Sequence, residues 1–262
     1  LIVYDCGNEA HAKRVENYMC AKGYTRAIVI LSHNDADHFD GIPYLVEKGL
    51  VSKVYTQLFL KHKEEIMKLL DDGRVTDHPV GERIKTVYSN IASLSKKVTL
   101  IDALTHCEIV PGVSIVGPTE DYALETIAKA LDSTEGNTIG AETVINAASV
   151  QISVDFMQDK CLLCGDASFE AIKRQIGNHP IIQLPHHGKP ATANDIFDAK
   201  IGQNNTLYIV SDNTGNSNGG SQDLNTVGRR VQNTINGDII YPSNTTAIGN
   251  KSIYPRTLGY TH

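Results

Sequence analysis

The sequence, 262 residues long, lacks three features that would each indicate a particular class of protein. No apolar run approaches the roughly 20 residues of a membrane-spanning helix, so we expect a soluble protein without membrane contact. The five cysteines are odd in number and scattered, which argues for reduced thiols rather than a disulfide framework. A basic excess is also missing: with a formal net charge of −6 and a pI of about 5.9, the composition does not indicate a nucleic-acid-binding surface.

Two of the cysteines, Cys161 and Cys164, form a Cys-x-x-Cys pair of the kind found in zinc and redox sites. They fall in an apolar run that predicts a strand, where positions three apart face opposite sides of the sheet. The two thiols therefore cannot bind one ion together, and we predict that both lie in the core.

A loop rich in metal-binding side chains follows the apolar run at 27–31. It places His33, Asp35, Asp37 and His38 within six residues. Two imidazoles and two carboxylates suit a divalent ion such as zinc or manganese. The alternative is a solvated acidic loop that happens to contain two histidines, and the three signals that follow weigh against it.

Three further predicted strands end in an acid or a histidine. Asp5 follows the apolar residues 1–4, Asp166 follows the run at 161–164, and His186 and His187 follow the run at 181–184. A chance buried histidine explains one such ending but not four. We therefore expect these residues to meet at one edge of a sheet core and to form a metal cluster.

These motifs resemble those of a known family. The loop reads His-x-Asp-x-Asp-His, similar to the His-x-His-x-Asp-His signature of the metallo-β-lactamase superfamily, with Asp35 in place of the second histidine. The later Leu-Leu-x-Gly-Asp-Ala and Pro-His-His-Gly motifs resemble the metallo-β-lactamase domain of ComEC-type competence proteins and their soluble relatives. The match extends from Asp5 to Gly188. The resemblance implies an α/β (α+β) chain folded as a four-layer αββα sandwich.

The resemblance also implies one domain over residues 1–262, with a first strand missing before residue 1. Apolar and turn patterns predict alternating strands and helices. We expect a helical insertion at about 58–97 beside the active-site mouth, although a purely packing role is equally open. The other expected elements are strands at 1–5, 27–31, 51–56, 207–210 and 238–241, two short strands within 99–116, a hairpin at 150–156 and 160–164, and helices at 10–22, 41–48, 123–131, 169–176 and 224–234.

By resemblance, the site binds two divalent ions, manganese or zinc, bridged by Asp166. One ion takes His33, Asp35 and Asp166, and the other takes Asp37, His38, Asp166 and one of His186 and His187. Asp5 is expected to orient a ligand histidine from behind. Asn146 and Ser149 resemble an Asn-x-x-Ser motif of the relatives and are expected beside the metals or the substrate. His106 is expected on the surface.

The resemblance implies a metal-dependent hydrolase in which an activated hydroxide attacks phosphorus or carbonyl carbon. We expect a phosphodiesterase or nuclease acting on DNA, with catalytic residues Asp37, Asp166 and His187, because the oxygen-rich site suits phosphoryl chemistry and favours manganese. Part of the negative charge lies in the metal site, where cations cancel it. The alternatives are a small-molecule ester or phosphoester hydrolase, similar to lactonases or phosphocholine esterases, and a non-catalytic, metal-stabilised sensing domain of a larger assembly.

The expected partners are nucleic acid as substrate and a protein partner or fused domain, with the oligomeric state open. The loop at 213–221 is rich in Asn, Gly and Ser; it could offer backbone amides to phosphates or be a mobile surface loop. A cytoplasmic, bacterial-type location is expected. Secretion stays open because the chain starts at Leu1 rather than at a methionine.

Overall fold

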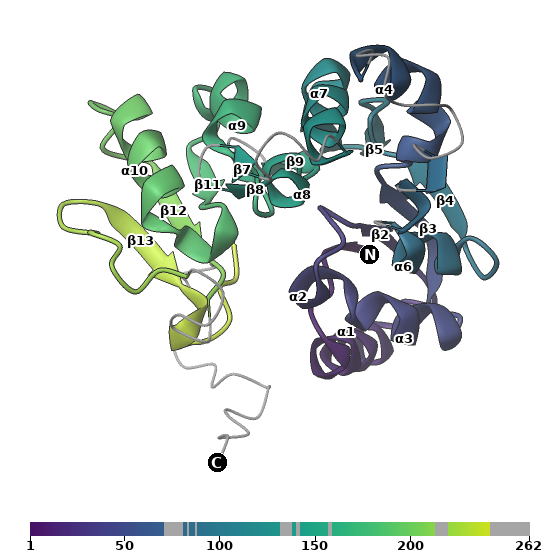
Figure 1. The fold of residues 1–262 in the computed structure, drawn as a ribbon. Helices are drawn as coiled ribbons and strands as arrows, with labels where there is room; N and C mark the ends of the chain where they lie inside the picture. Colours follow the sequence, from purple (N-terminus) through teal and green to yellow (C-terminus); the bar gives the residue numbers. More distant parts are fainter. Residues whose placement is uncertain are drawn as a thin grey trace.

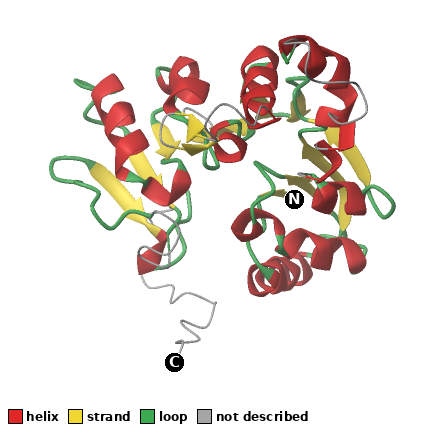
Figure 2. Ribbon diagram, viewed as in Figure 1, coloured by secondary structure: helices red, strands yellow, loops and turns green. Residues whose placement is uncertain are grey.

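A computed structural model of the chain describes residues 1–70, 81–82, 84–86, 88–131, 138–139, 142–156, 159–212 and 220–241. The N-terminal and C-terminal parts of the chain each build one large sheet with helices against it (Figures 1 and 2).

The N-terminal sheet has four strands in the order β1-β2-β3-β4, and all neighbouring pairs are parallel. The strands are β1 (Ile2–Tyr4), β2 (Ala27–Ile30), β3 (Val51–Thr56) and β4 (Thr99–Asp102). Because the strands are parallel, the residues that follow them gather at one edge of the sheet, and Asp5 and His33 are among these residues.

Helices cover the outer face of this sheet. The first begins at Asn8, whose side chain accepts hydrogen bonds from the amides of Ala10 and His11, and it ends at Gly23. Its Ala12 and Met19 pack with Val29 of β2 in one apolar cluster. The elements on this side are α1 (Glu9–Lys22), α2 (Ala36–Phe39), α3 (Gly41–Glu47), η1 (Phe59–His62), α4 (Lys63–Leu69), α6 (Ser89–Leu94) and α7 (Glu120–Leu131).

The C-terminal sheet has seven strands in the order β13-β12-β11-β10-β9-β6-β5. Strands β10 to β13 run parallel, and β9, β6 and β5 add antiparallel neighbours. Their bounds are β5 (Glu108–Val110), β6 (Val113–Gly117), β9 (Gln151–Phe156), β10 (Asp159–Leu163), β11 (Ile181–Gln183), β12 (Leu207–Val210) and β13 (Arg230–Asn233).

Helices α9 (Phe169–Ile176) and α10 (Pro190–Ala199) pack on the outer face of this sheet. The short turns η2 (His186–Gly188) and η3 (Thr234–Asn236) follow β11 and β13. A separate pair, β7 (Thr138–Ile139) and β8 (Glu142–Thr143), leads into α8 (Val144–Ala147). In Figure 1 this segment lies between the two halves of the molecule.

The inner faces of the two sheets pack against each other. Ile30 and Tyr55 from one sheet share a cluster with Ile115 and Ile152 from the other. Each such side chain contributes about 1.5–3 kcal/mol when fully buried. The layers therefore run helix, sheet, sheet, helix, which confirms the predicted αββα fold.

Cys161 and Cys164 lie on opposite faces of the C-terminal sheet, as predicted. Cys161 packs with Ile181 and Leu207 on one face, whereas Cys164 packs under α9 and α10 on the other. Both are buried free thiols. His106 is exposed, also as predicted.

Some predicted elements were wrong. Residues 224–234 do not form a helix: Gly228 has a φ of 74°, which interrupts a helix, and residues 230–233 pair with β12 and form the edge strand β13. The predicted closing strand at 238–241 has no strand pairing; instead the Tyr241 hydroxyl binds Asp159. Residues 99–116 form three strands instead of two, because β4 joins the N-terminal sheet.

The described part of the 58–97 segment contains the helical elements η1, α4 and α6. Residues 71–80, 83 and 87 of the predicted insertion lie outside the described residues, as do 213–219 of the loop at 213–221. Asn90 of α6 exchanges hydrogen bonds with Asn34 of the metal loop. This contact places α6 beside the site, and the status of the segment as an insertion stays a prediction.

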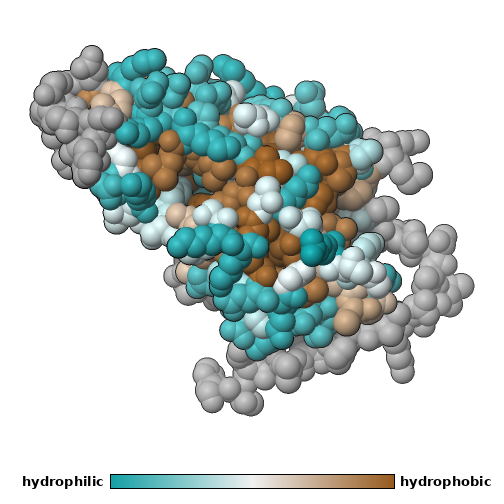
Figure 3. All heavy atoms as spheres, turned by 90° about the vertical axis from the view of Figure 1, so that its right-hand side faces the viewer, coloured by the Kyte–Doolittle hydropathy of each residue, from teal (hydrophilic) through white to brown (hydrophobic). Residues whose placement is uncertain are grey.

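Apolar side chains also reach the surface beside this segment. Figure 3 shows one face of the molecule, with hydrophobic residues gathered in its middle and hydrophilic ones around them. Leu60 of η1 and Leu69 of α4 are 41% and 49% exposed. Among the described residues, no helix is both long enough and apolar enough to cross a bilayer.

Candidate metal centre

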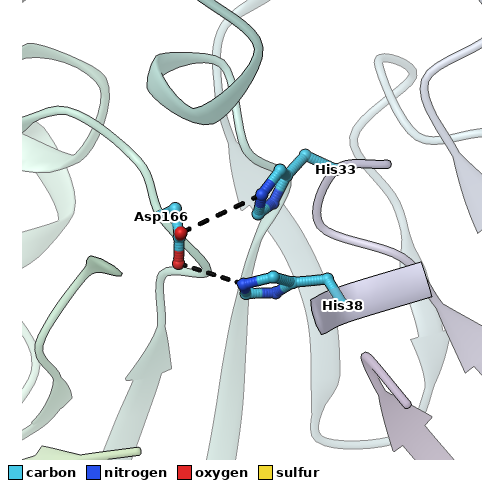
Figure 4. Close-up of side chains that lie close together, drawn as sticks. All are labelled: His33, His38 and Asp166. Carbon is cyan, nitrogen blue, oxygen red and sulfur yellow. Dashed lines mark ion pairs between the residues drawn. The ribbon is translucent and has the colours of Figure 1, made fainter. Parts of the chain in front are cut away.

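The residues that follow four strands converge where the edges of the two sheets meet. Asp5 follows β1 and His33 follows β2, while Asp166 and His186 come after β10 and β11 of the other sheet. Figure 4 shows the result: Asp166 faces His33 and His38 across the boundary between the sheets.

His33, His38 and Asp166 form the buried centre of the site. The Nε2 atom of His38 lies 3.3 Å from Oδ1 of Asp166, and Nε2 of His33 lies 3.9 Å from Oδ2 (Figure 4). The three side chains are only 1%, 8% and 4% exposed. One donor atom from each lies within 4.8 Å of the others, so the three could hold one ion.

A second group, Asp37, His38 and His187, shares His38 with the first and is more open to solvent. Nε2 of His187 lies 3.0 Å from Oδ2 of Asp37, within hydrogen-bond distance. The side chains of Asp37 and His187 are 36% and 18% exposed. The second group therefore forms the open side of the site.

Asp35 and His186 extend the first group. Oδ2 of Asp35 lies 3.6 Å from Nε2 of His33, and Nε2 of His186 lies 3.9 Å from Oδ2 of Asp166. Neither residue belongs to the two compact groups described above. The structure thus brings together all seven predicted ligands, with His186 and His187 directed at different carboxylates.

Each of the four imidazoles is held by its Nδ1 atom, which leaves Nε2 directed into the site. Nδ1 of His33 contacts the hydroxyls of Ser32 at 2.9 Å and Ser149 at 3.2 Å. Nδ1 of His38 lies 2.8 Å from Oδ2 of Asp5. Nδ1 of His186 contacts the carboxylate of Glu142. Nδ1 of His187 lies 2.7 Å from the carbonyl oxygen of Ser211. Partners of this kind fix the ring orientation and the tautomer of a metal-ligating histidine.

The charges of the site are tightly coupled. Burial alone would lower the pKa of His38, but the carboxylates of Asp5 and Asp166 raise it above its usual value. Burial would raise the pKa of Asp166, but the neighbouring His38 and His33 hold it well below its usual range. The hydrogen bond from His187 holds the pKa of Asp37 low as well. The carboxylates of Asp37 and Asp166 are therefore ionised, and a cation that binds beside them must displace protons from the neighbouring imidazoles.

The backbone around the site is strained. Among the described residues, three that are not glycine have a positive φ: Asp5 at 56°, His186 at 48° and His187 at 55°. All three belong to the site, and each such conformation costs about 1–2 kcal/mol. Packing and hydrogen bonds elsewhere must hold them, as is common at functional sites.

Glycine at position 165 lets Asp166 approach the other sheet. Gly165 has a φ of 56°, and a Cβ atom there would lie 2.6 Å from Cβ of Ser32 and 3.1 Å from Cβ of Ser149. Position 165 therefore needs a glycine for two reasons: the backbone is left-handed there, and the two strand ends leave no room for a side chain.

The donor atoms fit a divalent cation. Within the described residues, Nε2 of His33, Nε2 of His38 and Oδ1 of Asp166 are buried without a hydrogen bond, which is costly unless another partner is present. The imidazole nitrogens lie 3.3 and 3.9 Å from the oxygens of Asp166, which is longer than an ordinary hydrogen bond. These distances suit donors on either side of one ion at about 2.0–2.2 Å from each.

Comparison with protein-family models decides the family. The model of the metallo-beta-lactamase superfamily matches residues 1–210. The chain belongs to this superfamily. Members of the superfamily are generally metal-dependent hydrolases, and the grouped histidines and carboxylates of this chain suit the divalent ions that the fold implies.

Comparison with curated proteins gives no match. Solved structures do match the chain, including the following two. Zn(2+)-bound PqqB from Methylobacterium extorquens is 15% identical with a TM-score of 0.39, and the similarity covers 77% of this chain and 60% of that one. A CmlA beta-hydroxylase E377D mutant is 12% identical with a TM-score of 0.38, over 71% of this chain and 36% of that one. This member of the superfamily therefore spans less than two thirds of the length of either protein.

The remaining predicted residues of this superfamily member lie around the ligands. The Nδ2 atom of Asn146 donates to Oδ2 of Asp166 at 3.4 Å. The hydroxyl of Ser149 accepts from the amide of Asp166 at 3.2 Å and contacts His33. Asp5 also binds the amide and the hydroxyl of Ser32, at 2.7 Å each.

Three supporting residues were not predicted: Ser32, Glu142 and Ser211. Ser32 precedes His33 directly, and Ser211 follows the apolar run of β12, so the rule that strand ends carry the chemistry could have found both. Glu142 follows no apolar run of that kind. In the sequence, Glu142 is linked to the site only by its position four residues before the predicted site residue Asn146.

Proposed function

We propose that this superfamily member is a two-metal phosphodiesterase that cleaves DNA, the activity ascribed to the ComEC-type domains that its motifs resemble. The observation that carries the proposal is that three anchored histidines converge on one buried carboxylate, Asp166, and that both of its oxygens face imidazoles. Oδ1 of Asp166 faces His38, and Oδ2 faces His33 and His186. A carboxylate can serve two cations at once in this way.

Two half-sites follow from this division. We assign His33, Asp35, His186 and Oδ2 of Asp166 to the His33 half-site. The His38 half-site comprises Asp37, His38, His187 and Oδ1 of Asp166. Three carboxylates among seven side chains make the site rich in oxygen, which favours manganese more than a site richer in histidine would.

The substrate is expected to approach from the open side. The side chains of Asp35 and Asp37 are 44% and 36% exposed, whereas His33 and Asp166 are closed off. Asp37 and His187 therefore lie where a scissile phosphodiester would meet the site. Bound divalent ions in such sites lower the pKa of water and stabilise charge on the transferred phosphoryl oxygens. The role of the chain is to fix both half-sites and to exclude bulk water on the buried side.

Hydrolysis assays test the proposal. Labelled single- and double-stranded DNA and bis(p-nitrophenyl) phosphate are incubated with the protein and Mn²⁺, Zn²⁺ or chelator. We expect metal-dependent cleavage that the Asp37→Ala substitution abolishes. Asp40→Ala is the matched control, because Asp40 is an exposed aspartate of the same loop whose side chain makes no capping bond.

The substrates separate the candidate functions. Cleavage of DNA would support the nuclease. Cleavage of the small diester alone would instead indicate a small phosphodiester substrate, an outcome that the net charge of −6 favours, because acidic proteins repel polyanions. No cleavage under any metal, in a protein that binds two ions, would overturn the enzymatic proposal.

A further inference from the structure

Glu142 is a buried acid that the metal-binding motifs do not explain. It lies in the two-residue strand β8, and its side chain is fully buried, at 0% exposure. A buried carboxylate is costly unless it is paired and hydrogen-bonded. Three groups pair with it: Nδ1 of His186, Nζ of Lys189 at 3.2 Å and the hydroxyl of Thr192 at 3.3 Å.

All three partners lie on one short segment that includes a proposed ligand. His186 belongs to η2 after β11, Lys189 precedes α10, and Thr192 lies in the first turn of α10. Glu142 therefore connects β8 to this segment at three points. The hydrogen bond to Nδ1 of His186 leaves Nε2 of the same ring directed at Asp166.

The segment that carries Glu142 also contacts Asp166 directly. Asn146, in α8 directly after β8, donates to Oδ2 of Asp166 at 3.4 Å. Nε2 of His186 lies 3.9 Å from the same oxygen. Residues 142–147 thus support two of the side chains assigned to the His33 half-site.

The backbone of His186 shows why such support is needed. Its φ of 48° lies in the left-handed region, which is disfavoured for a residue with a side chain. The strained turn places two consecutive histidines at different carboxylates. Since His187 is held by the carbonyl oxygen of Ser211, the two rings have separate anchors.

We infer that Glu142 is a positioning residue for the His33 half-site: it fixes the imidazole of His186 toward Asp166, with Lys189 as its counter-charge. This inference rests on the proposed two-metal site. It is the counterpart of Asp5, which holds His38 in the other half-site at 2.8 Å. Each half-site then has one carboxylate that binds no metal and orients one histidine.

Metal titration tests the inference without relying on activity. Mn²⁺ binding is measured by calorimetry, and Co²⁺ binding by visible absorption, which reports the ligands around the ion. Glu142→Gln keeps an oxygen that can accept from His186 but removes the charge. We expect one of two ions to bind about 10–100-fold more weakly, with the other unchanged. Glu142→Leu removes the acceptor, so the weaker ion should be lost.

Thr192→Val is the matched control, because it removes another partner of Glu142 while leaving the contact with His186 in place. Its two metal affinities should equal those of the unsubstituted protein. If Glu142→Leu does not fold, Glu142→Gln still decides the question. Wild-type affinity for both ions in a folded Glu142→Gln protein, or equal weakening of both ions, would overturn the inference.

The two proposals fail separately. An unsubstituted protein that binds two ions but cleaves no phosphodiester would contradict the proposed function, while the Glu142→Gln titration would still decide the role of Glu142. An unsubstituted protein that binds a single ion would overturn the inference itself.

Discussion

The N-terminal and C-terminal halves contribute similar side chains to the metal centre but hold them differently. The N-terminal half supplies His33 and His38 from one short loop, supported by Asp5 and Ser32. The C-terminal half supplies Asp166, His186 and His187 from two strand ends. In both halves Nδ1 is bound and Nε2 faces the site.

The difference lies in the backbone of the candidate ligands. In the N-terminal half, the strained residue is Asp5, a supporting residue, while the ligands lie in ordinary conformations around α2. In the C-terminal half, the two candidate ligands His186 and His187 are themselves strained. Long-range contacts support both halves: Glu142 lies 44 residues from His186, and Ser149 lies 116 residues from His33. The C-terminal half therefore differs in needing contacts that hold its ligands in a disfavoured backbone conformation.

Asp166→Ala should have the largest effect, because this residue serves both half-sites. We expect both ions to be lost or greatly weakened, and hydrolysis to fall by more than the roughly 10–100-fold cost of losing a supporting partner. Metal content by mass spectrometry, together with hydrolysis rates, measures this. The circular dichroism spectrum should stay that of a folded protein. Retention of two ions at wild-type affinity would contradict the bridging role.

Gly165→Ala tests the contact between the two halves. The new Cβ would lie 2.6 Å from Cβ of Ser32, and the backbone has a φ of 56°. We expect a loss of about 2–5 kcal/mol in the free energy of unfolding, from overpacking and from the left-handed conformation together. Urea unfolding measures it.

Gly23→Ala is the control for the conformational part alone. Gly23 has a φ of 71°, and a Cβ there would meet nothing within 4 Å. Its expected cost is about 1–2 kcal/mol. Equal losses at Gly23 and Gly165 would mean that close packing between the halves does not limit the approach of Asp166.

Asp5→Ala tests the N-terminal half by removing the partner of His38 Nδ1. We expect the ion of the His38 half-site to bind about 10–100-fold more weakly. The other ion should be weakened less, because Asp5 reaches His33 only through the hydroxyl of Ser32. Mn²⁺ calorimetry measures both affinities, and a larger loss at the same ion in Asp5→Ala and Glu142→Gln would contradict the division into two half-sites.

The N-terminal half of the site could be predicted from the sequence because its residues are local. His33, Asp35, Asp37 and His38 form one motif after an apolar run, and that run is a buried strand in the structure. Asp166 and the two adjacent histidines could also be found, since each follows an apolar strand. Strand ends at one edge of a sheet come together whatever else the fold does.

The support for the C-terminal half could not be predicted in the same way. Glu142 meets His186 only after β8 packs against the segment before α10, a long-range contact without a local pattern. The positive φ angles of His186 and His187 have no signal in residue type. The predicted helix at 224–234 was wrong for a related reason: pairing with the edge of β12 outweighed the local helical pattern.

The smallest expected effect is a difference between the two halves in how easily they open. Buried thiols in each half report this opening, because they react only when exposed. Burial raises the pKa of Cys6, in the N-terminal half, and of Cys161, in the C-terminal half, to about 12. At pH 8 only about 1 in 10⁴ of such thiols is a thiolate, the reactive form. Cys20 is exposed and should react first with a thiol reagent.

We expect one fast phase that Cys20→Ser removes, a slower one from the half-buried Cys107, and no reaction of the buried thiols until the protein opens. Their labelling should speed up as the pH rises towards about 8.5, the ordinary pKa of an exposed thiol, because the opened thiol reacts as the thiolate. If the strained backbone makes the C-terminal half the less stable one, Cys161 should become reactive at lower urea than Cys6. Simultaneous exposure of both would mean that the two halves open as one cooperative unit.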